Sequence, residues 1–379
     1  MALTVFWACC ALLIYSYVLY PMLVAILAKR IGMPVVGDDA LRRTTIIVTV
    51  YNEADCIRAK LDNLAGLEYP RDLIQILVVS DGSSDATEEI AAGYELRPVR
   101  VLRVDGRKGK TACQNAAALV ADGEILVFTD ATTRLQADAI RAMASKFADP
   151  QVGCVGGRLE YVSNVENMTG SGGEAYWSYE TRLRIGESSL GSLIGVSGCL
   201  YAVRKSAYRP IDPGLISDFA IAMKMQEQGL RTVLAPDACC YEATLENGTR
   251  ELSMRVRVGV RSLNALVRER RFLNPVKHGR FAWQLWSHKV FRYASPFLWI
   301  GALTANMVLI NYHVAYLIMF VAQCSIIAAG VAGFILQDRR HNLGLLAKPY
   351  YFLLTNLASL IAALRYLRGE RMVVWTPVR

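Results

Sequence analysis

The sequence predicts an α/β domain with a mostly parallel sheet, set between apolar helices near both ends of the chain. Between residues 40 and 290, β-branched and apolar runs alternate with helical patterns, as expected for buried parallel strands and crossover helices. Outside this region, apolar segments are long enough to cross a bilayer. Hydrophobic residues make up 53% of the 379 residues and charged residues only 20%. Soluble domains carry about 25% charged residues, so this composition also indicates membrane segments and excludes a disordered chain.

Four strands are predicted in the first half of the middle region. They are expected at residues 44–50, 74–79, 99–104 and 124–129, because each is a short run rich in β-branched or apolar residues. Helices are expected at 55–67, in the stretch ending at 92, and at 110–120. This βαβα order predicts helices on both faces of the sheet.

Two aspartates lie where a ligand site is expected. Asp81 and Asp130 each directly follow a predicted strand, and ligands of open α/β sheets bind outside the carboxyl ends of the strands. Asp residues in such places also cap helices or shape turns, and Asp85 is expected to be the N-cap of the next helix. A ligand site and a turn-forming role therefore both remain open for Asp81 and Asp130.

The first apolar segment, residues 3–27, contains no charged side chain. At about 1.5 Å per residue, this length exceeds a hydrocarbon core of about 30 Å. Lys29 and Arg30 follow it and no basic residue precedes it, which predicts an external N-terminus and a cytosolic middle region. A cleaved signal peptide is the alternative, but it would need a basic start and a shorter apolar core.

The C-terminal third contains a second apolar block. Residues 295–336 can form two spanning helices with a polar turn at 311–313, and the preceding mixture of aromatic and basic residues predicts an interfacial helix. Residues 345–367 are also long enough to span. Four arginines follow the start of this last segment, at 365, 368, 371 and 379, so an interfacial or re-entrant segment with a cytosolic end is favoured over a spanning helix.

These patterns divide the chain into five parts. The expected parts are an N-terminal transmembrane anchor (1–30), a cytosolic α/β domain (40–270), an interfacial helix (271–293), two transmembrane helices (294–336) and an interfacial or re-entrant segment with a cytosolic tail (345–379). The nine cysteines form no C-x-x-C pair, which disfavours a zinc site and fits reduced thiols in a chain that faces the cytosol.

Six motifs then occur in a fixed order along the middle region. They are V-T-V-Y-N-E (48–53), V-V-S-D-G-S-S-D-A-T (78–87), G-R-K-G-K-T-A-C-Q-N (106–115), F-T-D-A-T (128–132), V-S-G-C-L-Y-A-V-R (196–204) and S-D-F-A-I-A-M-K-M-Q-E-Q-G (217–229). With its membrane flanks, the chain resembles family 2 glycosyltransferases with a GT-A fold. It is most similar to membrane-bound synthases of bacterial polysaccharides, namely cellulose, hyaluronan, poly-N-acetylglucosamine and chitin-oligosaccharide synthases.

The resemblance implies a nucleotide-sugar donor, UDP-linked by analogy with these synthases, and a site built from particular residues. The residues implied for donor binding are Tyr51, Asn52, Glu53, Asp81, Lys110, Asp130, Arg257 and Arg261. Asp130 is also the implied ligand of Mg²⁺ or Mn²⁺, which prefer carboxylate oxygens. The second acid of the family's D-x-D motif is replaced by Thr132, so one direct carboxylate ligand is expected rather than two.

On the acceptor side, the resemblance implies Ser197, Gly198 and a catalytic base, Asp218. Direct displacement at a sugar carbon needs a base that deprotonates the acceptor hydroxyl. The alternative role for Asp218 is the N-cap of the helix that follows it.

Processive relatives carry Q-x-x-R-W at the cytosolic membrane face, where this chain has Arg255-Val256-Arg257-Val258-Gly259-Val260-Arg261. The arginines are present, whereas the Gln and the Trp are not. Arg257 is the preferred diphosphate contact, with Arg255 or Arg261 as alternatives, because a guanidinium matches phosphate oxygens. Binding of lipid headgroups by this basic stretch is the competing interpretation.

The expected function is therefore an inverting membrane glycosyltransferase at the cytosolic face of the inner (plasma) membrane. The expected acceptor is a growing exopolysaccharide or a lipid-linked saccharide. Membrane lipids are also expected partners, together with further copies of the chain or an export partner. A glycolipid-forming transferase of single sugars and a non-catalytic scaffold that binds nucleotide or polymer are the alternatives. Nucleic acid is not an expected partner, because Lys108 and Lys110 in the basic stretch 103–110 belong to the family's donor loop.

Overall fold

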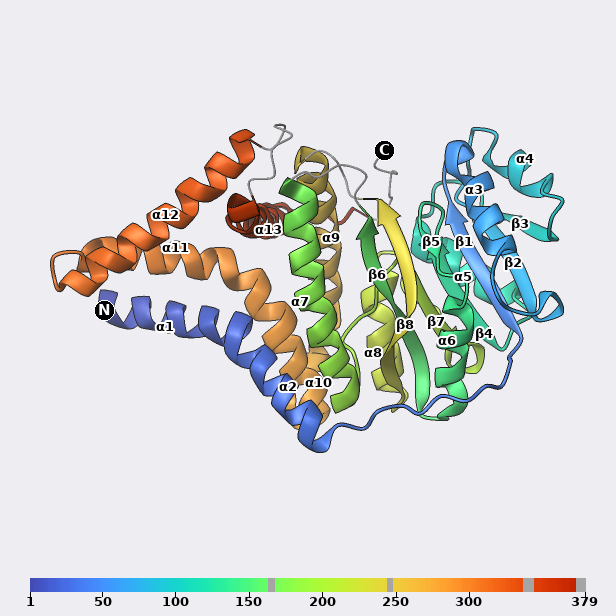
Figure 1. Ribbon diagram of the computed structural model, residues 1–379, viewed down its shortest axis with the longest axis horizontal. Coiled ribbons are helices and arrows are strands. Elements are labelled where there is room, and N and C mark those ends of the chain that lie inside the picture. Colours follow the sequence, from blue (N-terminus) through green and yellow to red (C-terminus); the bar gives the residue numbers. More distant parts are fainter. Residues whose placement is uncertain (163–167, 244–247, 337–343, 373–379) are drawn as a thin grey trace.

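The computed structural model describes residues 1–162, 168–243, 248–336 and 344–372 and has one eight-stranded sheet as its centre (Figure 1). The strands follow the spatial order β3-β2-β1-β4-β7-β6-β8-β5. Their bounds are Thr44–Val50 (β1), Ile74–Ser80 (β2), Val99–Arg103 (β3), Ile125–Asp130 (β4), Arg134–Leu135 (β5), Val152–Val162 (β6), Leu200–Arg204 (β7) and Arg231–Ala243 (β8).

The sheet is mostly parallel, which confirms the predicted fold class. Strand β1 pairs in parallel with β2 and β4, and β2 with β3, while β7 runs antiparallel between β4 and β6. The register places Val50 opposite Ser80 and Thr49 opposite Asp130. The carboxyl ends of β1, β2 and β4 therefore meet at one edge of the sheet.

Helices cover both faces of the sheet. Their bounds are Ala54–Ala65 (α3), Thr87–Ala92 (α4), Lys110–Val120 (α5), Ala139–Ser145 (α6), Met168–Leu190 (α7), Ser217–Glu227 (α8) and Gly248–Arg268 (α9). On β1, Ile46 and Val48 pack into one core with α3 and α6, whereas Ile47 packs into the other core with α5 and α8. All seven residues of β1 are buried, which is why its sequence is an uninterrupted β-branched run.

The predicted elements agree with the structure to within one or two residues. Strand β1 and helix α5 have the predicted bounds, β2 and β3 differ by one residue at one end, and β4 is shifted by one residue at both ends. Asp85 lies one residue before the N-cap of α4, which is Ala86. Its carboxylate accepts hydrogen bonds from the backbone N–H of Thr87 and of Ala54, so it joins the starts of α4 and α3.

Three helices are long and apolar enough to cross a membrane within the described parts of the chain. They are Ala2–Ile31, Val314–Leu336 (α12) and Leu346–Leu367. The first is continuous through α1 (Ala2–Ile14), a π-helical turn η1 (Tyr15–Leu19) and α2 (Tyr20–Ile31). Helix α11 (Phe291–Leu309), the other half of the expected pair in 294–336, does not reach that standard of length and apolarity.

The segment before α11 packs into the protein more closely than an interfacial helix requires. It consists of α10 (Pro275–Leu285) and a π-helical turn η6 (Trp286–Val290). Phe281 is buried against the core under α8, and Arg292, which follows the segment, forms an ion pair with the buried Glu180 of α7. Arg339, Arg340 and the residues from 373 onward, which support the expected topology, lie outside the described residues.

Helix α13 (Gly344–Leu367) lies against the soluble domain. Ala358 and Ala362 pack on Val256 and Val260 of α9. Figure 1 shows α13 end-on, whereas α1 runs along the long axis of the molecule. If α1 crosses the membrane, α13 therefore runs across that direction, as an interfacial helix does.

We predict that the turn between α11 and α12 is external and the C-terminus cytosolic, because arginines follow α13. Asn311→Cys, in a background with the exposed Cys324 replaced by Ser, should react with a membrane-impermeant thiol reagent in intact cells. A Cys added after Arg379 should react only after permeabilisation, and the Cys324→Ser parent reports background labelling. Labelling of the added C-terminal Cys in intact cells would instead mean that α13 spans.

Candidate functional site

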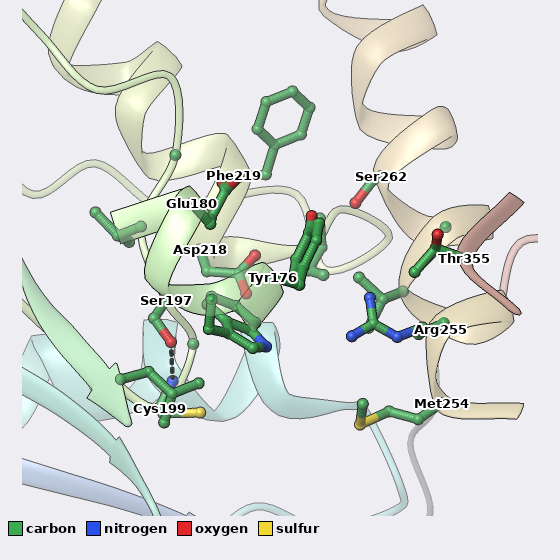
Figure 2. Close-up of a pocket in the computed structure, with 18 of the residues that line it drawn as sticks. Tyr176, Glu180, Ser197, Cys199, Asp218, Phe219, Met254, Arg255, Ser262 and Thr355 are labelled. Carbon is green, nitrogen blue, oxygen red and sulfur yellow. Dashed lines mark hydrogen bonds between the residues drawn. The ribbon is translucent and has the colours of Figure 1, made fainter. Parts of the chain in front are cut away.

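A cavity of about 840 Å³ opens at the carboxyl edge of the sheet. Its walls come from that edge, from α7, α8 and α9, and from the helices on the membrane side, including η6, α11 and α13. Figure 2 shows part of it, with Ser197 and Asp218 from the sheet side and Arg255 and Thr355 from α9 and α13. The members of the predicted site that line it are Glu53, Lys110, Asp130, Ser197, Gly198, Asp218, Arg257 and Arg261.

Lys110 and Asp130 form an ion pair in this cavity. Lys110 is the first residue of α5, and Asp130 is the last residue of β4. The Lys110 ammonium also donates to the Gly198 carbonyl at 3.3 Å. Burial alone would lower the pKa of Lys110, but the Asp130 carboxylate more than offsets this and raises it. The cation therefore stays charged where a diphosphate would need it.

Asp218 lies in the first turn of α8, whose N-cap is Ile216. Its predicted alternative role as the N-cap is therefore wrong. Burial raises the pKa of the Asp218 carboxyl, and the nearby cations Lys110, Arg261 and Lys289 lower it only in part. A carboxylate with a raised pKa is a better proton acceptor, as a general base requires.

Gly198 and Ser197 belong to the loop that faces Asp218. A Cβ at Gly198 would lie 2.8 Å from Oδ2 of Asp218, so only glycine leaves room for that carboxylate. The backbone N–H of Val196 donates to the Asp218 carbonyl at 2.9 Å, which ties this loop to α8. The Ser197 hydroxyl accepts from the Cys199 N–H (Figure 2).

The arginines of α9 divide into two roles. Arg255 forms an ion pair with Glu251 and donates to the Tyr351 hydroxyl, so it joins α9 to α13. Arg257 and Arg261 line the cavity, and burial lowers the pKa of each. The Nε atom of Arg261 is buried without a hydrogen-bond partner. Buried cations need an anionic partner, so the structure favours Arg261 over Arg255 as a phosphate contact, and Arg257 lines the same cavity.

Asp81 is fully buried and holds the loop before α5. Its carboxylate accepts from the backbone N–H of Lys108 at 2.7 Å and of Gly109 at 3.1 Å. Gly109 has φ of 90°, a conformation that glycine adopts without strain. Asp81 therefore positions this loop, and its own side chain is not among those that line the cavity.

The motif at residues 48–53 contacts this loop and the turn that contains Ser84. The Arg107 guanidinium covers the ring of Tyr51, and Asn52 accepts from the backbone N–H of Ser84 at 2.8 Å. Glu53 is buried and lines the cavity. A nucleobase that stacked on Tyr51 would have to displace Arg107.

Several charged residues in or near the site were not predicted from the sequence, among them Glu242, Lys289 and Lys60. Glu242, near the end of β8, lines the cavity, and burial together with the Asp130 carboxylate raises the pKa of its carboxyl. Lys289 lines the cavity from η6. Lys60 lies beneath the site and donates to Thr129 Oγ1 at 3.0 Å. An acid at a strand end, the signal used for Asp81 and Asp130, could have identified Glu242.

Lys60 is a buried cation beneath the site. It also donates to the Thr133 carbonyl, at 2.5 Å, and so holds the turn that carries Asp130. Burial lowers the pKa of Lys60 to about 8. Lys60 belongs to none of the sequence motifs. Its role can be recognised only from the packing of α3 under the end of β4.

Aromatic side chains cover the membrane side of the cavity. Tyr176 and Trp177 of α7 line it together with Tyr293 and Tyr351. Aromatic rings with polar tips offer a flat apolar surface and a hydrogen-bonding edge. Tyr176 and Tyr351 lie beside Arg255, in the stretch that corresponds to Q-x-x-R-W but lacks its Trp.

Comparison with known proteins shows what the α/β domain is similar to. Residues 45–211 match the model of the glycosyl transferase family 2. A poly-beta-1,6-N-acetyl-D-glucosamine synthase of Staphylococcus aureus (strain MSSA476) is 26% identical over 257 residues, which are 65% of this chain and 61% of that protein. An N-acetylglucosaminyltransferase of Rhizobium sp. (strain N33) is 30% identical over 220 residues, 54% of this chain and 49% of that protein. The matches thus span about three fifths or less of these relatives.

A solved structure shares the fold over nearly the whole chain. The mannosyltransferase PcManGT from Pyrobaculum calidifontis, in complex with GDP-Man and Mn²⁺, is 22% identical and has a TM-score of 0.71. The alignment covers 97% of this chain and 100% of that one. Residues 45–211 of this protein thus match the glycosyl transferase family 2 model, and the chain has the GT-A fold.

Proposed function

We propose that this protein is an inverting membrane glycosyltransferase. It moves a sugar from a nucleotide-sugar donor, most simply a UDP-sugar, to a saccharide or lipid-linked acceptor at the cytosolic membrane face. One observation carries the proposal: a single cavity at the carboxyl edge of the sheet contains a carboxylate with a raised pKa, Asp218, among several cations. That combination is what an acceptor hydroxyl and a departing diphosphate require.

The cations act on the donor. Lys110, Arg257 and Arg261 approach the cavity from α5 and α9. As the bond between the sugar and the diphosphate breaks, negative charge grows on the diphosphate oxygens, and fixed cations stabilise it. The Nε atom of Arg261 is buried without a hydrogen-bond partner, so this guanidinium still has a donor to satisfy.

Asp218 acts on the acceptor. Its carboxylate removes the proton of the attacking hydroxyl, the hydroxyl oxygen forms the new bond to the anomeric carbon, and the nucleoside diphosphate leaves from the opposite side. A single displacement of this kind inverts the configuration. Gly198 keeps the approach to the carboxylate open, because any larger residue would contact Oδ2.

A divalent metal fits this site only together with the donor. The described residues contain no group of three His, Cys, Asp or Glu side chains that could hold an ion. Mg²⁺ is often bound through one or two carboxylates plus substrate phosphates, and Asp130 can supply one carboxylate. The ion would add positive charge beside the leaving diphosphate, and Lys110 would then give up its direct contact with Asp130.

The position of the cavity supports an acceptor at the membrane. Its walls include Tyr17 from the N-terminal candidate span and Tyr351 and Phe352 from α13. A growing polymer and a lipid-linked sugar would both reach Asp218 from this side. Screening the purified full chain against nucleotide-sugars by nucleotide release, followed by mass spectrometry of the product, tests the proposal. Absence of transfer from every donor to either acceptor class would overturn it.

Asp218→Asn is expected to lower turnover by a factor of about 10² to 10⁴, because the amide cannot accept the proton. Donor binding, measured by calorimetry, should persist. Asp237→Asn, an exposed acid on β8, is the matched control and should keep wild-type turnover. Wild-type turnover in Asp218→Asn would remove this residue from the mechanism.

The pH profile of the wild type gives a second measurement of the same group. The base must be ionised, so turnover should fall as pH decreases through the pKa of Asp218. Since burial raises that pKa, the acidic limb should lie above the value of about 3.9 for a free Asp side chain. A profile that stays flat down to pH 4 would contradict the assignment.

Gly198→Ala is expected to lower turnover at least tenfold while the melting temperature changes little. Its methyl group would meet Asp218 Oδ2 at 2.8 Å and the Lys110 ammonium at 3.5 Å, and displacement of a catalytic group by about 1 Å can cost 10²-fold. Gly66→Ala is the control, because a Cβ there meets only carbonyl oxygens at 3.6 and 3.7 Å. Equal turnover in the two variants would show that the space at Gly198 is not needed.

Removal of divalent metal with EDTA is expected to abolish transfer, and Mg²⁺ or Mn²⁺ should restore it. Asp130→Ala should raise the metal concentration needed for half-maximal rate, since it removes the one carboxylate available to the ion. Full activity in metal-free buffer would mean that Lys110 and the two arginines stabilise the diphosphate alone.

A further inference from the structure

A second cavity, of about 400 Å³, lies at the opposite edge of the sheet from the catalytic cavity. It is lined at the amino ends of β1, β2 and β3 and by the turns that lead into β2 and β3. Strand β1 has seven residues, so about 20 Å of strand separates the two edges. None of its lining residues belongs to the donor or acceptor site.

Arg97 is the unusual residue of this second cavity. Its side chain is 6% exposed, and its Nε and Nη1 atoms are buried without a hydrogen-bond partner. A guanidinium cannot avoid its charge by deprotonation, and buried charges are normally paired. The fold therefore holds a buried cation in place without supplying its anion.

The neighbours of Arg97 increase the need for an anion. Arg71 lies close enough that, after burial itself, it further lowers the pKa of Arg97. Arg43 and Arg100 also line the cavity. The acids of the lining are Asp72 and Asp122, and Asp122 already accepts a hydrogen bond from the Gln75 amide at 2.5 Å.

We propose that this cavity binds a phosphate-type oxyanion of a small soluble molecule, with Arg97 as its central contact and Arg71 as its second. Guanidinium groups recognise phosphate by parallel N–H donors, and such charge-assisted hydrogen bonds are the strong ones. The volume is within the range of small-molecule sites and leaves room for more than the phosphate itself.

The place of the cavity in the molecule selects a soluble ligand over a lipid headgroup. Strands β1 to β3 lie at the end of the molecule farthest from α1, α11 and α12 (Figure 1). The candidate spans Ala2–Ile31 and Val314–Leu336 extend toward the other end, and the third, in α13, lies between them and the sheet. A headgroup in the bilayer that contains those spans could not reach Arg97.

The test uses the purified full chain in detergent and inorganic phosphate as the probe. At constant ionic strength, millimolar phosphate should raise the melting temperature of the wild type by about 2 °C or more, because a ligand that binds only the folded state stabilises it. Arg97→Met should abolish this shift, and Arg71→Ala, a substitution at an exposed position, should at least halve it. Arg261→Met, the matched substitution in the catalytic cavity, should keep it.

Each possible result decides the question. A shift that is lost in Arg261→Met but kept in Arg97→Met would place phosphate in the catalytic cavity and overturn the second site. No shift in the wild type would overturn it as well. If Arg97→Met does not fold, Arg71→Ala carries the test alone, and an undiminished shift in that variant would refute the proposal. Donor turnover plays no part in these readings, so failure here leaves the proposed transferase activity unaffected.

Discussion

The fully buried carboxylate of Asp81 is the contact on which the rest of the site depends. By accepting the backbone N–H groups of Lys108 and Gly109, it fixes where helix α5 begins. That start places Lys110 against Asp130, at the end of the neighbouring strand β4. Loss of this acceptor would leave the buried N–H of Gly109 unsatisfied, at a cost of about 1–3 kcal/mol. The buried Asp81 carboxylate thus fixes the positions of Lys110 and Asp130, which themselves line the cavity.

A second buried network joins this domain to the N-terminal helix. Tyr20 donates to Glu187 of α7, and His288 lies between Glu187 and Glu180 at 2.8 and 2.9 Å. Arg292 completes the network with an ion pair to Glu180 at 2.9 Å. Removal of one partner from such a buried set typically costs about 3–5 kcal/mol, because the remaining charge is left uncompensated. The same helix α7 also brings Tyr176 and Trp177 to the cavity. The network therefore connects the N-terminal helix to the aromatic residues that line the cavity.

Much of the domain could be predicted because its information is local. The strand at Thr44–Val50 is buried on both faces, and its sequence is accordingly an unbroken β-branched run. Asp81 and Asp130 were found because parallel strands end at one edge, where acids are conspicuous. Lys110, Asp218 and the arginines of α9 needed the family resemblance, since no spacing rule relates segments so far apart. The structure then separates the two aspartates by location: Asp81 holds a loop beneath the site, whereas Asp218 lines the cavity.

The sequence by itself determined the α/β class, the strand ends that form the site and the apolar segments, because side-chain periodicity and strand chemistry depend on near neighbours. Only the tertiary structure decided which charges share a cavity. The pairing of β8 brings Glu242 close to Asp130. The packing of α3 lets Lys60 hold the turn that follows Asp130. Arg97 is buried, and its Nε and Nη1 atoms have no hydrogen-bond partner. Each of these is a balance between burial and charge, and burial is a property of the packed chain that no stretch of sequence carries alone.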